Sequence, residues 1–158
     1  MRIYADTSFL VKLLTQEPGT ATAVADYRRL GRPPVFFLSL HNLEVANAVR
    51  QRAFHQRRTV PSSERAAIRR ECETSLGLIQ TYISRRAFIE ISHDMDSAIE
   101  LARSLSAKHT ERLGCRGFDL LHVALALELE CEAFLTADSI QGELARAEGL
   151  EVTLSADE

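Results

Sequence analysis

The chain has 158 residues, of which 46% are hydrophobic and 26% charged, and its formal net charge is −3. These values are typical of one globular domain, which at this length buries roughly 70% of its unfolded surface. The charge argues against constitutive, non-specific nucleic-acid binding, and no apolar run approaches the roughly 20 residues of a membrane span. We therefore expect a single cytoplasmic domain over residues 1–158 that does not associate with a membrane.

The N-terminus and the cysteines support this expectation. A strand-like run begins almost at the first residue and ends at Asp6, so no secretory signal is expected. The three cysteines have no C-x-x-C spacing, which favours reduced thiols over a zinc site or a disulfide framework. They are Cys72, Cys115 and Cys131.

The first half of the chain alternates short apolar runs with longer segments of helical pattern. Pro18 and Gly19 separate two predicted helices, and a Gly-Arg-Pro-Pro sequence at 31–34 ends the second. Ser39 is the expected cap of the next helix, which carries residues 41–55. The predicted elements are a strand at 2–6, helices at 7–15 and 20–30, and a strand at 35–38.

The second half continues the alternation. Pro61 opens a helix whose apolar residues recur every three or four positions, from Ile68 to Ile83. The segment 118–130 is apolar on nearly all sides, which predicts a buried helix. The remaining predicted elements are a strand at 87–91, a helix from about 94, a strand at 133–136, a helix at 138–148 and a strand at 150–154.

Strands and helices in alternation predict an α/β fold: a three-layer sandwich with a mostly parallel central sheet of about five strands. In such sheets ligands bind outside the carboxyl ends of the strands. Asp6 and Asp138 lie at such ends, and Glu44 and Asp119 lie near helix starts that face the same edge. We therefore expect these four acids to converge.

Each acid also has a structural explanation. Asp6 and Asp138 precede helices and suit the N-cap position, Asp119 lies in a first helical turn, where the helix dipole favours it, and Glu44 suits a solvated helix surface. The explanations weaken in combination, because two of the acids lie in apolar surroundings. Crowded carboxylates repel unless a cation neutralises them. A shared site therefore implies a hard divalent metal and phosphate chemistry.

Arginine is concentrated in one region. Residues 50–86 carry nine arginines against three glutamates, a local charge of +6. Guanidinium groups suit bidentate phosphate contacts, although for any single arginine a solvated helix face is the simpler explanation. The candidate phosphate contacts are Arg50, Arg57 and Arg58 in this region and Arg116 beside the acids.

The acids and their surroundings resemble a PIN domain, in particular the VapC toxins of bacterial toxin–antitoxin pairs. The resemblance spans the whole chain, and the ordered set of motifs is more specific than any one of them. The matching segments are Tyr4-Ala5-Asp6-Thr7-Ser8-Phe9-Leu10, Gln16-Glu17-Pro18-Gly19, Leu43-Glu44-Val45-Ala46-Asn47-Ala48, Arg116-Gly117-Phe118-Asp119-Leu120-Leu121-His122-Val123-Ala124 and Phe134-Leu135-Thr136-Ala137-Asp138.

The resemblance implies an endoribonuclease that depends on Mg²⁺ or Mn²⁺, acts as the toxin of a type II pair, forms homodimers and is silenced by a cognate antitoxin. By position, Asp6, Glu44, Asp119 and Asp138 would be the catalytic, metal-binding acids. Thr7, Ser8 and Thr136 would support them or face phosphate. The chain departs from the family in an apparently longer, arginine-rich helical stretch at about 55–86. Its expected role is to shape the RNA groove, the dimer or the antitoxin surface.

Oxygen ligands favour Mg²⁺ or Mn²⁺ over zinc. Such an ion lowers the pKa of a bound water for in-line attack on a phosphodiester, so no protein nucleophile is required. His122 shares a helical face with Asp119, but a lone His on an apolar helix is more often a hydrogen-bonded core residue. The alternative hypothesis is a non-catalytic PIN-like module that binds RNA or protein.

Overall fold

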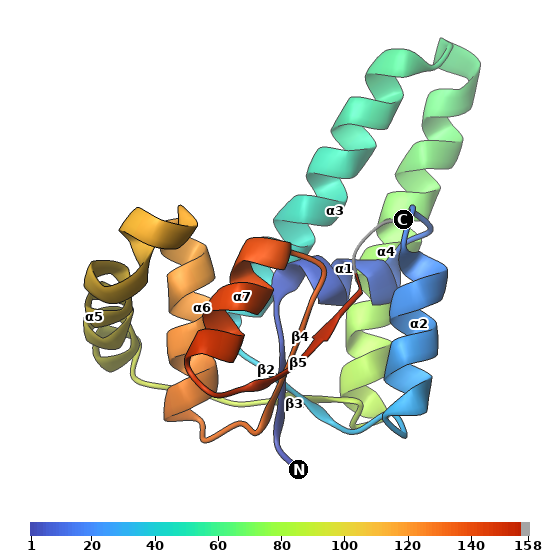
Figure 1. The fold of residues 1–158 in the computed structure, drawn as a ribbon. Coiled ribbons are helices and arrows are strands. Elements are labelled where there is room, and N and C mark those ends of the chain that lie inside the picture. The colour runs from blue at the N-terminus through green and yellow to red at the C-terminus, as the bar shows by residue number, and fades with distance from the viewer. Residues whose placement is uncertain (156–158) are drawn as a thin grey trace.

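The computed structural model describes residues 1–155, in which strands and helices alternate (Figure 1). Five strands form one sheet in the order β3-β2-β1-β4-β5, and every neighbouring pair is parallel. The prediction of an α/β fold around a mostly parallel sheet is confirmed. The strands are β1 (Ile3–Ala5), β2 (Val35–Phe37), β3 (Phe88–Glu90), β4 (Ala133–Thr136) and β5 (Glu151–Leu154).

Seven α-helices flank the sheet within residues 1–155, with a short 3₁₀ turn (Ser62–Glu64) between the third and fourth. One hydrophobic core joins a sheet face to α5, α6 and α7, and a second joins the other face to α1, α2 and α4. The helices are α1 (Thr7–Leu14), α2 (Thr20–Arg29), α3 (Ser39–Thr59), α4 (Arg65–Ser84), α5 (Met95–Leu113), α6 (Gly117–Glu128) and α7 (Ser139–Ala147).

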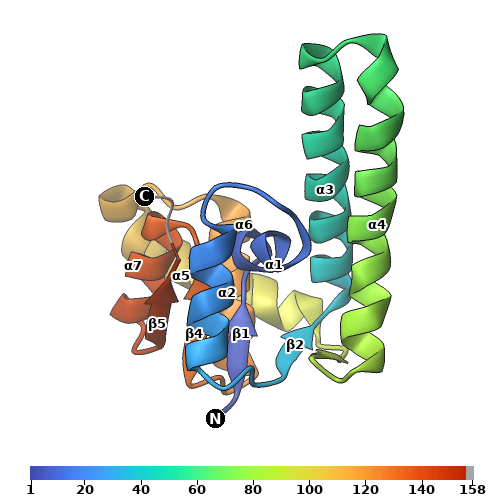
Figure 2. The ribbon, with the colours of Figure 1, turned by 90° about the vertical axis from the view of Figure 1, so that its right-hand side faces the viewer.

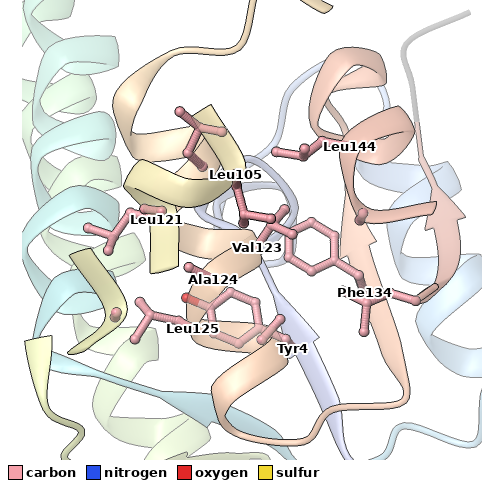
Figure 3. Close-up of a cluster of buried hydrophobic side chains, with 14 of the residues drawn as sticks. Tyr4, Leu105, Leu121, Val123, Ala124, Leu125, Phe134 and Leu144 are labelled. Atoms are coloured by element: carbon pink, nitrogen blue, oxygen red, sulfur yellow. The ribbon is translucent and has the colours of Figure 1, made fainter. Parts of the chain in front are cut away.

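Side chains of the central strands alternate between the two cores, as the period of a strand requires. Tyr4 and Phe134 enter the core beneath α6, where their rings stack with centroids 5.6 Å apart (Figure 3). Ile3 and Leu135 enter the opposite core. Helix α6 is buried from Asp119 to Ala126, which confirms the buried helix predicted from its apolar composition. The sheet and α6 thus hold the ends of β1 and β4 in place.

Helices α3 and α4 form a long hairpin that projects from the sheet layers (Figures 1 and 2). Val45 and Val49 are buried near the base of α3, and Ile79 anchors α4 in the second core. An ion pair of 3.6 Å between Arg52 and Glu71 joins the two helices farther out. The arginine-rich stretch predicted at 55–86 covers the end of α3, the 3₁₀ turn and α4.

The prediction that Ser39 caps α3 is wrong. Leu38 occupies the N-cap position, and Ser39 is the first helical residue. The imidazole Nδ1 of His41 instead accepts the Leu38 backbone N–H at 3.0 Å, so a side chain inside the first turn satisfies the donor that precedes it. Within residues 1–155 no helix is long and apolar enough to cross a membrane.

Candidate active site

A pocket of about 560 Å³ opens at the carboxyl ends of β1 and β4, between the first turns of α1, α3, α6 and α7. We call it the acidic pocket, because five carboxylates line it against three basic side chains, those of Lys12, Arg116 and His122. The predicted convergence of the four acids on one pocket is therefore observed. The five carboxylates belong to Asp6, Glu17, Glu44, Asp119 and Asp138.

Asp6 is the most enclosed of these acids, with 3% of its surface exposed. It caps α1 by accepting the Phe9 N–H at 2.9 Å, and the hydroxyls of Ser8 and Thr136 donate to it at 2.8 and 2.9 Å. Burial raises the pKa of Asp6 to about 6, and the charge of His122 and these hydrogen bonds only partly oppose that rise. The pocket therefore holds a carboxylate whose negative charge is poorly compensated.

Two hydroxyls tie the end of β1 to the end of β4. The Ser8 hydroxyl accepts the Ala137 N–H at 2.9 Å while it donates to Asp6. The Thr136 hydroxyl accepts the Asp138 N–H at 2.9 Å and also donates to Asp6. These bonds fix the Asp6 carboxylate in relation to the backbone that carries Asp138.

Glu44 is held by a chain of buried groups. Its Oε2 accepts from the Thr7 hydroxyl at 2.9 Å and lies 2.6 Å from His122 Nε2, while His122 Nδ1 lies 2.8 Å from the Tyr4 hydroxyl. Burial would raise the pKa of Glu44, but the hydrogen bond and charge of His122, with the bond from Thr7, lower it below its ordinary value. Glu44 therefore stays ionised in the pocket.

The guanidinium of Arg116 bridges the other two acids. Its Nε lies 3.1 Å from Asp119 Oδ2, and its Nη2 lies 3.1 Å from Asp138 Oδ2. Asp119 also accepts the Arg116 backbone N–H at 3.0 Å, which fixes it at the start of α6. The Arg116 side chain is 75% exposed, so water weakens both ion pairs. Arg116 is an exposed positive charge between two anchored negative ones.

Asp138 confirms that one residue can serve as a helix cap and as a pocket acid. Its Oδ1 accepts the N–H groups of Ile140 and Gln141 at 2.9 and 3.1 Å, while its other oxygen faces Arg116. Asp6 does the same for α1. The structural and functional explanations of these two residues are therefore compatible.

The remaining predicted site residues divide into two groups. Thr7, Ser8 and Arg116 line the acidic pocket, and Thr136 lies behind it in contact with Asp6. Arg50, Arg57 and Arg58 do not line the pocket; they are exposed farther along α3.

His122 is the pocket residue that sequence reasoning set aside. It is a buried, hydrogen-bonded residue, as expected of a lone His on an apolar helix, but its partner is the pocket acid Glu44. Lys12 and Gln141 also line the pocket without having been predicted. The spacing of His122 three residues after Asp119 was the one available signal.

The donor atoms of the four acids fit a hard divalent cation, because they are all carboxylate oxygens. Within residues 1–155, however, no three His, Cys, Asp or Glu side chains form a group that could hold one ion. Arg116 forms ion pairs with Asp119 and Asp138, and His122 forms a hydrogen bond with Glu44. The direct metal ligands therefore stay a prediction, and their convergence would need Arg116 to release at least one carboxylate.

A family model, the PIN domain, matches residues 3–147 of the chain. The resemblance inferred from the motifs is thereby confirmed at the level of the family. PIN domains are a family of nucleases, and PIN nucleases typically use divalent metal ions. No curated protein matches the chain.

Proposed function

The chain belongs to the PIN-domain family, and from that premise we propose that it is a Mg²⁺- or Mn²⁺-dependent endoribonuclease that hydrolyses RNA phosphodiester bonds. The observation that carries the proposal is the convergence of Asp6, Glu44, Asp119 and Asp138 on one open pocket. Four carboxylates gathered together, one of them the buried Asp6 with its raised pKa, favour a bound cation.

In the proposed mechanism the four carboxylates would hold the divalent ion, which would supply Lewis acidity and offset charge on the scissile phosphate. Ser8 and Thr136 fix the Asp6 oxygens, and the Tyr4–His122 pair fixes Glu44, so these ligands need little rearrangement. Thr7 and Ser8 begin α1, whose positive dipole end faces the pocket and attracts an anionic phosphate.

Arginines would hold the rest of the RNA. Once a cation occupies the acids, the exposed guanidinium of Arg116 is free to turn toward a substrate phosphate. Arg50 and Arg57 are seven residues apart on α3, which starts at the pocket, and Arg58 lies over the Phe54 ring at 5.4 Å. Replacing Arg50, Arg57 and Arg58 by Gln should weaken the salt dependence of RNA binding. The slope of the logarithm of the affinity against the logarithm of the salt concentration should fall in magnitude by up to about 3. An unchanged slope would remove these arginines from the RNA path.

We place this activity in the cytoplasm, in the toxin of a type II toxin–antitoxin pair that acts as a homodimer with a cognate antitoxin. Support for this narrower assignment comes from the ordered motifs alone. Two measurements test it: sedimentation of the purified chain, which should give a dimer mass, and growth arrest on expression, which a neighbouring reading frame should relieve. A monomer mass would contradict the proposed homodimer. Growth arrest that no neighbouring reading frame relieves would contradict the proposed antitoxin.

The nuclease itself is tested by incubating a mixed structured-RNA pool with the purified chain in Mn²⁺, in Mg²⁺ and in chelator. The key variant is Asp119→Asn, which keeps an acceptor for the Arg116 N–H and removes the charge. Its cleavage rate should fall by about 10²- to 10³-fold, the usual loss when one key electrostatic group is removed.

The matched control is Asp94→Asn. Asp94 also stands at a helix start, capping α5 through the Asp96 and Ser97 N–H groups, but it does not line the pocket. This variant should cleave like the wild type. Equal cleavage by both variants would refute the assignment of Asp119. No cleavage by the folded wild type in either metal would favour the non-catalytic binding module.

A further inference from the structure

A second hollow, of about 480 Å³, lies against the carboxyl-terminal parts of α1, α2 and α4 and the segments that lead into β2 and β3. We call it the basic cleft, because its charged lining residues are Arg28, Arg32 and Arg85. Its volume is in the range of small-molecule sites. Apart from Thr81, the rest of the wall is apolar or aromatic and includes Leu13, Val24, Leu78, Tyr27 and Tyr82.

Among the described residues, no acidic side chain offsets the positive charge of the basic cleft. No acid lines it, and none of its three arginines forms an ion pair within residues 1–155. The carboxyl ends of α2 and α4 contribute about −0.5 charge each. Against three guanidinium groups this leaves a charge of roughly +2, so an anion that enters the cleft is attracted.

The wall of the cleft is held by the backbone around it. Arg32 has a left-handed conformation, with φ of 53°, and its N–H donates to the Tyr27 carbonyl at 2.9 Å. The Tyr27 hydroxyl donates to the Pro33 carbonyl at 2.8 Å, and the Tyr82 hydroxyl donates to the Leu13 carbonyl at 3.4 Å. The tyrosine hydroxyls are thus engaged with the backbone, and the cleft has an apolar and aromatic wall beside its charges.

We propose that the basic cleft binds a nucleotide: the arginines hold its phosphate and the apolar and aromatic wall receives its base. Guanidinium groups match phosphate in geometry as well as in charge. A flat base suits aromatic side chains and guanidinium planes. The ligand is either a free nucleotide or a nucleotide within an RNA chain, since both present the same chemistry.

The basic cleft is separate from the acidic pocket. Val11 and Lys12 on α1 line the acidic pocket, whereas the next residue, Leu13, lines the basic cleft. The acidic pocket opens at the carboxyl ends of β1 and β4, while Arg32 and Ala87 in the basic cleft precede β2 and β3. Binding in the cleft therefore does not depend on cleavage at the acidic pocket, and it is measured in chelator.

The chain offers a charge-matched pair of variants. Arg28 and Arg85 line the cleft, but their neighbours Arg29 and Arg86 do not. Arg29 pairs with Asp26 at 2.9 Å instead. The test variant is therefore Arg28→Gln with Arg85→Gln, and the control is Arg29→Gln with Arg86→Gln. Both lose two positive charges from the same helix ends.

Binding is measured by titration calorimetry at low salt with chelator, using AMP, GMP, inorganic phosphate and a short single-stranded RNA. The wild type should bind, and the test variant should bind about 100-fold more weakly, since two charge-assisted hydrogen bonds are lost. The control variant should stay within about twofold of the wild type. If the test variant does not fold, Arg32→Asn carries the test, because asparagine tolerates a left-handed conformation.

Each outcome decides the proposal. Binding of mononucleotides that the test variant alone loses supports a free-nucleotide site. Binding of RNA alone, lost in the same variant, supports a site for a nucleotide within a chain. Equal loss in both variants would show a general effect of charge and overturn the proposal. So would the absence of nucleotide and RNA binding by the wild type.

Discussion

The acidic pocket and the basic cleft are similar in volume but are built in different ways. The four predicted acids of the pocket are all hydrogen-bonded or ion-paired, and Asp6 and Asp138 also cap helices. The arginines of the cleft have no ion-pair partner within residues 1–155 and stand at helix ends and in a loop. The charged groups of the pocket are therefore part of what holds the fold together, whereas the charged groups of the cleft are added at its surface.

Metal binding should give the largest difference between the two regions. Mn²⁺ at about 100 times its dissociation constant should stabilise the wild type by about 2.7 kcal/mol. Asp138→Asn keeps the cap of α7, because Asn caps as well as Asp, but removes a charge from the acidic pocket. If affinity falls tenfold, the stabilisation should drop to about 1.4 kcal/mol, measured by thermal unfolding with and without metal.

Asp94→Asn is again the matched control. Asp138 and Asp94 each accept the N–H groups two and three residues ahead, but only Asp138 faces the acidic pocket. The control should keep the full stabilisation by Mn²⁺. Equal metal effects in the two variants would mean that the metal binds elsewhere, and the contrast between pocket and cleft would lose its basis.

Acid should weaken the pocket side of the molecule through His41. Burial, followed by the charge of His122, lowers the pKa of His41 well below 6.5, and its ring lies 5.0 Å from that of Tyr4. The unfolded chain binds this proton at about pH 6.5. Stability is therefore present above that pH and is lost as the pH falls, by up to roughly 1.4 kcal/mol per pH unit.

The measurement is denaturant unfolding between pH 7 and 5, with His41→Gln for comparison. Gln at this position can still accept the Leu38 N–H but does not titrate. Asp6 acts in the opposite direction, since its raised pKa adds stability as the pH falls through about 6, and it is common to both proteins. The wild type should lose stability relative to the variant. Parallel pH profiles would contradict the role of His41.

The smallest difference should come from one tyrosine hydroxyl in each region. Tyr4→Phe removes the buried contact to His122 Nδ1 at 2.8 Å and should cost about 1 kcal/mol. Tyr82→Phe removes a longer contact, at 3.4 Å, to the Leu13 carbonyl beside the basic cleft, and should cost about 0.5 kcal/mol or less. The measurement is the free energy of unfolding of each variant relative to the wild type. Equal losses in the two variants would contradict the difference in construction between the acidic pocket and the basic cleft.

The sequence predicts most of the fold because its signals are local. Short apolar runs mark all five strands, and Asp6 and Asp138 follow two strands that pair in the sheet. The prediction placed the cap of α3 at Ser39 and not at Leu38, because the Leu38 N–H is accepted by the imidazole of His41, a residue inside the helix. The bond between Glu44 and His122 was missed because it joins residues 78 apart, whose approach depends on how α3 and α6 pack.

The basic cleft was missed for a similar reason. Arg85 belongs to the arginine-rich stretch 50–86, and sequence distance groups it with the arginines of the hairpin. In the structure it lies with Arg28 and Arg32, which belong to a different part of the chain. Counting charges along the sequence therefore identified a basic region, but it could not show that Arg85 lies close to Arg28 and Arg32 in the folded chain.

The pairing of β1 with β4 also sets when the acidic pocket can form. Ile3 aligns with Ala133, and Asp6 receives its hydrogen bond from Thr136, 130 residues later. A ribosome that has made the first 130 residues has produced three of the four predicted acids but neither this neighbouring strand nor the Thr136 hydroxyl. Contacts of such long sequence separation form late. A chain interrupted before β4 therefore lacks the pocket, and the pocket is completed only after Asp138 has been made.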